Sequence, residues 1–339
     1  MQKDGSIYKF ILGGRGVGKT FGFLKYVIDK LRGTDRKFIF MRRTQTQVDI
    51  IQTPDLNPFR ALEEELGEDY RFVMKKINKS ITGIYRLIED GEGQFVPDPV
   101  PAGYMMALST VSNIRGFSGA DVDYLIYDEF VGEAHEKPIR NESQAFLNAI
   151  ETIARNRELK GQLPLQVVCL SNSNLLANPL FIGLGFVTAC EKAMRKNRDL
   201  IVLAEQKSAI YLIHDSPISR KKEQTSLYAL AGRDSAFSRM ALDNEFTGDY
   251  LGMVRSMKLS EYRPVCAVGE IVIYKHKSKR EWYVTEHRSG QPAVYDSSEI
   301  EIRRWAHDYY YLKLAYMNRH IWFENYVQQV LFEKYIKAG

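Results

Sequence analysis

The chain has 339 residues, of which 45% are hydrophobic and 26% charged, and its formal net charge is +5. This length predicts more than one domain, and no apolar run approaches the roughly 18 residues of a membrane span, so we expect no membrane partner. The three cysteines lack the spacing of a disulfide framework or a zinc site, while the mild positive charge permits a polyanionic partner without requiring one.

The first predicted element is a strand at residues 8–12, followed by a glycine-rich loop and a helical pattern from Phe21 to Leu31. The loop matches G-x-x-x-x-G-K-[ST], the pattern of a P-loop, at every fixed position. Glycines without side chains let backbone N–H groups close around a phosphate, and the helix dipole favours its charge. We expect Lys19 to reach the β- and γ-phosphates and Thr20 to bind Mg²⁺. The predicted phosphate-binding residues are Gly13, Gly14, Arg15, Gly16, Val17, Gly18, Lys19 and Thr20.

A second buried strand, predicted at residues 37–41, ends at the pair Arg42 and Arg43. Ligands lie beyond the carboxyl ends of parallel strands, so this pair is predicted to project toward the nucleotide. A solvated basic turn is the alternative. A helix at residues 58–66 and β-rich runs with turns over residues 71–107 follow, and the latter indicate a hairpin inserted in the sheet.

The most informative later element is the mostly apolar run at residues 124–127, which is followed by Asp128 and Glu129. This pattern predicts a buried strand that delivers two carboxylates to its carboxyl end, as in a Walker B element. One carboxylate orients the water shell of Mg²⁺, and the other accepts a proton from the attacking water. We assign the metal role to Asp128 and the base role to Glu129. Together with the P-loop, they predict ATP hydrolysis.

Polar residues at the ends of two further elements complete the candidate site. A strand predicted at residues 166–170 ends in Ser171 and Asn172, which sense the γ-phosphate or simply end the strand. A helix predicted at residues 141–158 closes with Arg155 and Arg157. A charged helix end is usually a solvated surface. In a ring ATPase, however, such an arginine reaches the neighbouring subunit's nucleotide as a finger in trans.

The ATPase pattern fades after residue 215, and the remaining chain divides into two further parts. Residues 218–251 are predicted to form short helices of a linker or lid. Beyond them, strands flank a basic turn at residues 275–280, which fits a phosphate backbone or a solvated hairpin equally well. Residues 305–316 and 321–336 are predicted as core helices. The predicted domains are 1–217, 218–251 and 252–339.

Together these motifs resemble the DNA-packaging ATPases, or encapsidation proteins, of small tailed phages of the phi-twenty-nine type, which are related to large terminase subunits. The resemblance is carried in order by Gly-Gly-Arg-Gly-Val-Gly-Lys-Thr (13–20), Arg42-Arg43, Tyr-Asp-Glu-Phe (127–130), Arg-Asn-Arg-Glu (155–158), Cys-Leu-Ser-Asn (169–172), Asn178-Pro179 and Leu-Asp-Asn-Glu-Phe (242–246). It implies catalytic roles for Lys19 and Glu129, and for Arg155 as the trans finger. Arg157 is a close competitor for that last role.

The resemblance also implies a fold and a set of partners. The expected fold is an α/β P-loop NTPase of the ASCE or RecA-like type with a mostly parallel sheet, a helical linker and an α+β C-terminal domain. That last domain would be a vestigial RNase H-like nuclease without nuclease activity. The expected function is a viral genome-packaging motor that hydrolyses ATP to translocate double-stranded DNA, with ATP and Mg²⁺ as cofactors. It would work as a homo-oligomeric ring, expected to be a pentamer, on the portal or connector of a procapsid, with a structural packaging RNA as an optional partner.

The expected location follows from the N-terminus, where the P-loop strand begins too early for a signal peptide. This predicts a protein of the host-cell cytoplasm that attaches transiently to the portal vertex. Two other classes stay open. A P-loop helicase or DNA-repair ATPase would act on nucleic acid without a capsid. A nucleotide switch or kinase-like protein would respond little to DNA, and the pair Asp128 and Glu129 argues against it, since a water-activating glutamate suits hydrolysis.

Overall fold

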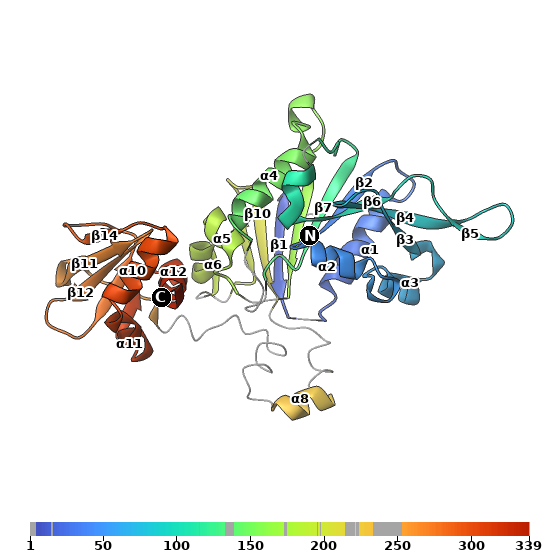
Figure 1. The fold of residues 1–339 in the computed structure, drawn as a ribbon. Helices are drawn as coiled ribbons and strands as arrows, with labels where there is room; N and C mark the ends of the chain where they lie inside the picture. Colours follow the sequence, from blue (N-terminus) through green and yellow to red (C-terminus); the bar gives the residue numbers. More distant parts are fainter. Residues whose placement is uncertain are drawn as a thin grey trace. The chain divides into compact units, whose positions relative to one another are not determined.

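The structure is a computed structural model of the chain, and it divides into two compact units. The N-terminal unit comprises Met1–Leu184 with Ala193–Glu245, and the C-terminal unit comprises Gly185–Lys192 with Phe246–Gly339. Figure 1 shows the ribbon coloured along the sequence. The described residues are 5–14, 16–114, 116–132, 139–172, 175–194, 196, 198–213, 221, 224–232 and 253–338.

The N-terminal unit is built on a 10-stranded sheet with the order β3-β4-β6-β2-β7-β8-β1-β10-β9, in which β5 pairs with β4. All neighbours from β6 to β10 run parallel, whereas β3-β4-β6 and β10-β9 are antiparallel. The mostly parallel α/β sheet predicted from the sequence is thus confirmed. Its strands are β1 (Tyr8–Gly13), β2 (Lys37–Arg42), β3 (Phe72–Lys76), β4 (Ile81–Glu89), β5 (Phe95–Pro97), β6 (Gly103–Ala107), β7 (Val122–Asp128), β8 (Gln166–Ser171), β9 (Leu200–Leu203) and β10 (Ser208–Ile213).

Helices cover both faces of this sheet, which explains why its central strands are continuous apolar runs. The first three helices pack on one face, where Leu24 and Ile28 of the first helix join Phe40 of β2 in one core cluster. On the other face, Phe181 contacts Phe10 of β1 through their aromatic rings. The helices of this unit are α1 (Lys19–Leu31), α2 (Gln45–Ile51), α3 (Arg60–Leu66), α4 (Glu142–Ala154), α5 (Pro179–Leu184) and α8 (Ser226–Ala231), with short 3-10 turns η1 (Pro54–Leu56), η2 (Glu68–Tyr70), η3 (Leu108–Ile114) and η4 (Glu158–Lys160). Most residues of α6 (Val187–Met194) belong to the C-terminal unit.

Two expectations for this unit are refined by the structure. The β-rich segment at residues 71–107 forms antiparallel strands that extend the sheet beyond β2, as the predicted hairpin requires. The helix predicted at residues 141–158 ends earlier, at Ala154. The reason is local, because Arg155 and Asn156 adopt left-handed backbone angles, with φ of 43° and 57°, and such residues cannot continue a right-handed helix.

The C-terminal unit is an α+β structure around a five-stranded sheet of order β14-β11-β12-β13-β15. Helices pack on this sheet through Trp305 and Phe332, which are fully buried with Phe323 in one core cluster. The expected core role of these aromatic side chains is confirmed. The elements are η6 (Leu259–Glu261), β11 (Tyr262–Val268), β12 (Ile271–His276), β13 (Trp282–Thr285), β14 (Ala293–Tyr295), α10 (Glu299–Asp308), α11 (Tyr311–Met317), β15 (Ile321–Phe323) and α12 (Tyr326–Ala338).

One element in this half of the chain differs from its prediction. Residues 321–323 were expected to be helical, but Ile321, Trp322 and Phe323 form β15, which pairs in parallel with β13. Branched and aromatic side chains favour a strand wherever a neighbouring strand is available. Of the predicted linker at residues 218–251, the described part contains α8. The domain boundaries remain predictions, and the grouping of residues 185–192 with the C-terminal unit was not indicated by the sequence. Among the residues described, none of the helices combines the length and apolar character of a bilayer-crossing segment.

Candidate functional site

The P-loop lies between the end of β1 and the start of α1. Gly16 and Gly18 both have φ of 78°, a left-handed conformation that glycine adopts without steric cost. Lys19 is only 8% exposed, and its Nζ donates hydrogen bonds to the carbonyl oxygens of Gly13 (2.8 Å) and Gly14 (2.7 Å). The lysine therefore fixes the curvature of its own loop. Arg15, which the sequence placed in this loop, lies outside the described residues.

The Walker B strand β7 brings its acidic end against the P-loop. Its last four residues, from Leu125 to Asp128, are buried, and Asp128 is 2% exposed. The Oγ1 of Thr20 donates a hydrogen bond of 3.0 Å to Oδ1 of Asp128. Burial raises the pKa of the Asp128 carboxyl, and the positive charge of Arg42 partly opposes that shift. Two residues separated by more than a hundred positions thus form one polar centre, as the two motifs predicted.

Glu129 follows Asp128 in a strained backbone conformation with φ of 54°. A non-glycine residue held in this region costs on the order of 1 kcal/mol or more, and such strain concentrates at functional sites. Its Oε1 accepts a hydrogen bond of 3.2 Å from Nδ2 of Asn172, and its Oε2 forms an ion pair with Nη1 of Arg42. Both oxygens of the predicted base are therefore engaged.

Arg42 connects the two acidic residues of the Walker B end. It is the last residue of β2, and its side chain is 11% exposed. Besides its ion pair with Glu129, its Nη2 lies 3.0 Å from Oδ2 of Asp128. Its Nε is buried and has no hydrogen-bond partner within the described residues. Arg42 therefore projects toward the nucleotide end of the sheet, as expected.

Arg43, the next residue, does not share this position. Its guanidinium is bound in a bidentate manner by Glu142 at the start of α4, with Nε–Oε1 and Nη2–Oε2 distances of 2.9 and 3.1 Å. The hydroxyl of Tyr127 donates a further hydrogen bond of 3.3 Å to Glu142 Oε1. Arg43 and Glu142 are each 3% exposed. This buried pair fastens α4 to β2 and β7, so the expectation for the arginine pair holds for Arg42 alone.

The end of β8 contributes the predicted polar pair. Ser171 is 1% exposed and closes the strand, and Asn172 follows it. Because Asn172 donates to Glu129, it contacts the predicted base directly. Of the two interpretations left open by the sequence, contact with the site has geometric support for Asn172. A role for Ser171 remains a prediction.

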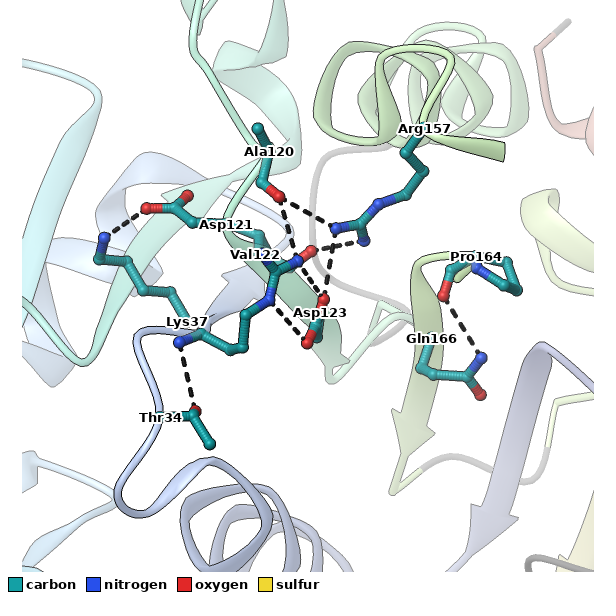
Figure 2. A network of polar contacts seen from close by, with 10 residues as sticks. Thr34, Lys37, Ala120, Asp121, Val122, Asp123, Arg157, Pro164 and Gln166 are labelled. Atoms are coloured by element: carbon teal, nitrogen blue, oxygen red, sulfur yellow. Dashed lines mark hydrogen bonds and ion pairs between the residues drawn. The ribbon is translucent and has the colours of Figure 1, made fainter. Parts of the chain in front are cut away.

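Arg155 and Arg157, the two candidate fingers, are separated by the fold. Arg157 is 3% exposed, and its guanidinium donates to the carbonyl oxygens of Val122 and Ala120 and to Asp123 Oδ1 at the amino end of β7 (Figure 2). Arg155 is exposed. A 13-residue helix separates it from Glu142, a span of about 20 Å. Arg155 is thus available to another molecule and remote from its own Glu129.

Two features of this arrangement were not evident from the sequence: the part played by Glu142 and the bridging role of Arg42. Glu142 carries no signal, because a single acid at a helix start is common. The bridging role of Arg42 was signalled only by its place at a strand end, and its two carboxylate partners became visible once β2 and β7 were known to be neighbours.

Comparison with known proteins adds an independent line of observation. Residues 1–274 match the family model of the Podovirus DNA encapsidation protein (Gp16). The DNA packaging protein of Bacillus phage phi29 is 25% identical over 244 residues, which is 72% of this chain and 63% of the relative. The DNA packaging protein of Bacillus phage B103 has the same identity, and 65% of it is covered. The chain thus spans less than two thirds of the length of these relatives.

Two solved structures share the fold over most of the chain. The bacteriophage Phi-29 viral genome packaging motor assembly contains a chain that aligns with a TM-score of 0.63 and 21% identity, covering 98% of this chain and 96% of that one. The Phi-28 gp11 DNA packaging motor aligns with a TM-score of 0.61 and 18% identity, covering 98% and 94%. These similarities establish a common fold.

Proposed function

The chain belongs to the Podovirus DNA encapsidation protein (Gp16) family, and from this premise we propose that it is the ATPase that drives double-stranded DNA into a viral procapsid. The observation that carries the proposal is the contact between Thr20 of the P-loop and Asp128 of the Walker B strand, at 3.0 Å. That contact joins the phosphate-binding loop to the residues required for hydrolysis. The phi29 relative is a DNA packaging protein, which supports DNA translocation as the process that ATP hydrolysis drives.

Binding of ATP is assigned to the P-loop. The left-handed glycines aim backbone N–H groups into the loop, where successive donors bind phosphate oxygens. The ammonium group of Lys19 is held within the loop by two carbonyl groups, and its charge is available to the β- and γ-phosphates of ATP. Substitution of Lys19 would therefore weaken nucleotide binding before it affected any later step.

The residues present fit a magnesium ion. Mg²⁺ prefers hard oxygen ligands and usually binds through one or two protein groups together with water and phosphate oxygens. Thr20 and Asp128 supply a hydroxyl and a carboxylate 3.0 Å apart. Within the described ranges no cluster of three or more His, Cys, Asp or Glu side chains forms a self-sufficient metal site. Thr20 would hold the ion directly and Asp128 through water, and the ion would neutralise charge on the phosphates.

Glu129 is the proposed general base. Its carboxylate would accept the proton of the attacking water, and it is held at Oε1 by Asn172 and at Oε2 by Arg42. Release of one contact would free a carboxylate oxygen for the attacking water. Arg42 is the better candidate for release, since the γ-phosphate is an alternative anion for it and its Nε has an unused donor. This arrangement would couple nucleotide binding to activation of the base.

The oligomeric part of the proposal depends on Arg155. Its guanidinium is exposed and lies about one 13-residue helix away from the start of α4, so its own nucleotide is out of reach. We assign it as the finger that stabilises transition-state charge in the neighbouring copy of a ring. The further elements are a pentameric ring on the portal, an optional packaging RNA, and action in the host-cell cytoplasm during capsid filling. Salt-sensitive, sequence-independent contacts to DNA phosphates would follow.

The C-terminal unit is proposed to be a vestigial RNase H-like domain without nuclease activity. Nuclease chemistry requires several carboxylates that converge on metal ions. Two of the acids here form ion pairs within their own helix, Glu299 with Arg303 and Glu301 with Arg304. Asp308 accepts a hydrogen bond from the hydroxyl of Tyr295. Asp296 accepts from the backbone N–H of Ser298. Each of these four acids has a local structural partner, which supports a packing role.

The test is steady-state ATP turnover with and without long double-stranded DNA of arbitrary sequence. We expect DNA to stimulate turnover, and we expect Glu129→Gln and Arg155→Ala to be inactive alone. When they are mixed, hybrid interfaces with one intact Glu129 and one intact Arg155 should restore part of the activity. Lys79→Ala, which removes an exposed cation elsewhere, is the matched control and should behave as the unmodified chain.

Two outcomes would contradict the proposal. If DNA has no effect and Arg155→Ala hydrolyses ATP normally, the P-loop belongs to a switch or a kinase-like enzyme. If single-stranded nucleic acid stimulates turnover better than duplex does, and the protein does not associate with procapsids, the helicase alternative is favoured.

A further inference from the structure

The turn that follows α4 is held in place by an arginine whose two Nη groups donate mainly to main-chain carbonyl groups. Nη1 of Arg157 donates to the carbonyl oxygen of Val122 at 2.6 Å, and Nη2 donates to that of Ala120 at 3.2 Å and to Asp123 Oδ1 at 3.3 Å. Figure 2 shows Arg157 reaching from the end of the helix to these groups. Asp123 is also paired with Arg36, which restricts its position. This buried contact fixes the turn to the amino end of β7.

The backbone of Arg157 organises the same turn. Its N–H donates to Ala154 at 3.0 Å, and its carbonyl oxygen accepts from the N–H groups of Lys160 and Gln162, each at 3.0 Å. Two successive left-handed residues, Arg155 and Asn156, precede it. Such conformations persist only where surrounding contacts over-determine them. Arg157 supplies those contacts through both its side chain and its backbone, so residues 155–163, which we call the finger turn, adopt one defined shape.

The finger turn displays two apolar side chains to solvent, together with the cations Arg155 and Lys160. Leu159 is 85% exposed and Leu163 is 84% exposed. Arg155 is also exposed, and in the part of the chain that the structure describes no hydrogen bond or ion pair of its side chain is seen. A rigid turn that presents leucines beside a cation has the composition of an interface patch, in which apolar contacts surround a charged one.

We propose that the finger turn is the surface with which each copy of this chain docks onto the nucleotide site of the next copy, and that Arg157 is the positioning residue of that surface. The inference rests on the proposed trans role of Arg155 and adds the apolar contact of Leu159 and Leu163. The partner is a second copy, because the nucleotide at its P-loop would supply the phosphate anions with which Arg155 pairs. On its own chain, Asp128 and Glu129 lie at the opposite end of β7 from the Arg157 anchor.

This arrangement links two sites through one strand. The carboxyl end of β7 carries Asp128, and its amino end holds the finger turn through Val122 and Asp123. A displacement of β7 that accompanies nucleotide binding in one copy would therefore move the finger that the same copy offers to its neighbour. Head-to-tail contacts of this kind, repeated with rotation, close into a ring.

The test is a complementation experiment with the full chain and DNA-stimulated ATP turnover as the readout. The variants are Arg157→Lys, which keeps the charge but not the forked donor geometry, and the double change Leu159→Ser with Leu163→Ser. We expect turnover to fall about 10²-fold for Arg157→Lys, the usual cost of a catalytic group misplaced by 1 Å. For the leucine variant we expect a loss of about 10-fold. Nucleotide affinity, measured with a fluorescent ATP analogue, should stay unchanged in both.

Mixing the variants assigns each to one side of the interface. Both should regain activity when mixed with Glu129→Gln, because hybrid interfaces then combine an intact Glu129 with an intact finger turn. Neither should regain activity when mixed with Arg155→Ala, since each copy then lacks a working finger turn. A residue that only stabilises the fold would lower nucleotide affinity. Its variant would not show the same complementation pattern as Arg155→Ala.

The outcomes that overturn the inference differ from those that overturn the proposed function. If Arg155→Ala is complemented by Glu129→Gln but the leucine variant is fully active, or is complemented by Arg155→Ala, the docking surface is wrong. If Arg155→Ala itself is active, the trans finger is wrong instead. Because Leu159 and Leu163 are exposed, their substitution does not threaten folding, so the leucine variant decides the matter even if Arg157→Lys is unstable.

Discussion

The two ends of β7 both place an arginine against a carboxylate, and they use it differently. At the amino end, Arg157 donates mainly to carbonyl oxygens of the main chain. At the carboxyl end, Arg42 pairs with both Asp128 and Glu129, the two carboxylates assigned to hydrolysis. An Nε without a partner in the described structure and nearby left-handed residues occur at both ends, so neither feature distinguishes them. The partners do: main-chain carbonyl groups indicate a structural contact, whereas two carboxylates that share one arginine indicate a site whose contacts change during the reaction.

The same contrast separates neighbours in sequence. Arg42 and Arg43 are adjacent, yet one contacts the catalytic carboxylates and the other is locked against Glu142. Successive side chains of a strand point to opposite faces, which sends the two arginines apart at the end of β2. The residue type alone therefore does not indicate which arginine takes part in chemistry. The following predictions test this division between the two kinds of contact.

The largest expected effect is at the carboxyl end, on the base. Glu129→Gln keeps the size and hydrogen-bonding capacity of the side chain but removes its basicity. We expect turnover to fall about 10²- to 10⁴-fold, the usual contribution of a general base, while nucleotide binding is retained. Single-turnover hydrolysis and equilibrium binding of ATP would measure the two quantities separately. Turnover near that of the unmodified chain would show that another residue activates water.

Next in size is the loss of stability expected from Arg43→Ala. This change leaves Glu142 buried without its bidentate partner, and breaking one side of a buried pair typically costs about 3–5 kcal/mol. Chemical denaturation would measure the free energy of unfolding. If the loss of unfolding free energy is below 1 kcal/mol while hydrolysis is abolished, Arg43 takes part in catalysis as Arg42 does. The proposed distinction between the two arginines would then be wrong.

A smaller effect, opposite in sign, is expected for Asp128→Asn. The folded-state pKa of Asp128 is raised, mainly by burial, so its contribution to stability is fully present at low pH and is lost as pH rises through that pKa. The asparagine variant should match the unmodified chain near pH 4 and be more stable at pH 7, by roughly 1 kcal/mol. Melting temperatures over this pH range, without nucleotide, test the sign. A less stable variant at pH 7 would mean that attraction to Arg42 outweighs burial.

The smallest effect is expected for an exposed ion pair that serves as a reference. Lys76 and Asp49 lie 3.1 Å apart with side chains 61% and 44% exposed. Because solvent screens such pairs, Lys76→Ala should change the free energy of unfolding by about 0.5 kcal/mol or less. The same denaturation experiment as for Arg43→Ala provides the comparison. Equal losses of unfolding free energy for Lys76→Ala and Arg43→Ala would show that burial does not determine how strongly an ion pair stabilises the fold.

Much of the site was determined by the sequence itself. The P-loop pattern, the acidic end of the strand at 124–127 and the strands at 8–12, 37–41 and 166–170 are local features, and each is found where it was predicted. They are readable because consecutive residues specify them. Glycines set the loop, apolar runs set buried strands, and parallel strands bring their carboxyl ends to one edge. The family resemblance rests on these same local patterns.

The tertiary structure decided which polar residues meet. The division of labour between Arg42 and Arg43, and between Arg155 and Arg157, depends on partners such as Glu142 and Asp123 that are distant in sequence. Likewise, Ile321–Phe323 became a strand because β13 offered a free edge. Side-chain pairing and burial are properties of the assembled sheet and depend on residues far apart in the sequence. Motifs and periodicity are properties of short segments, so they can be recognised from the sequence alone.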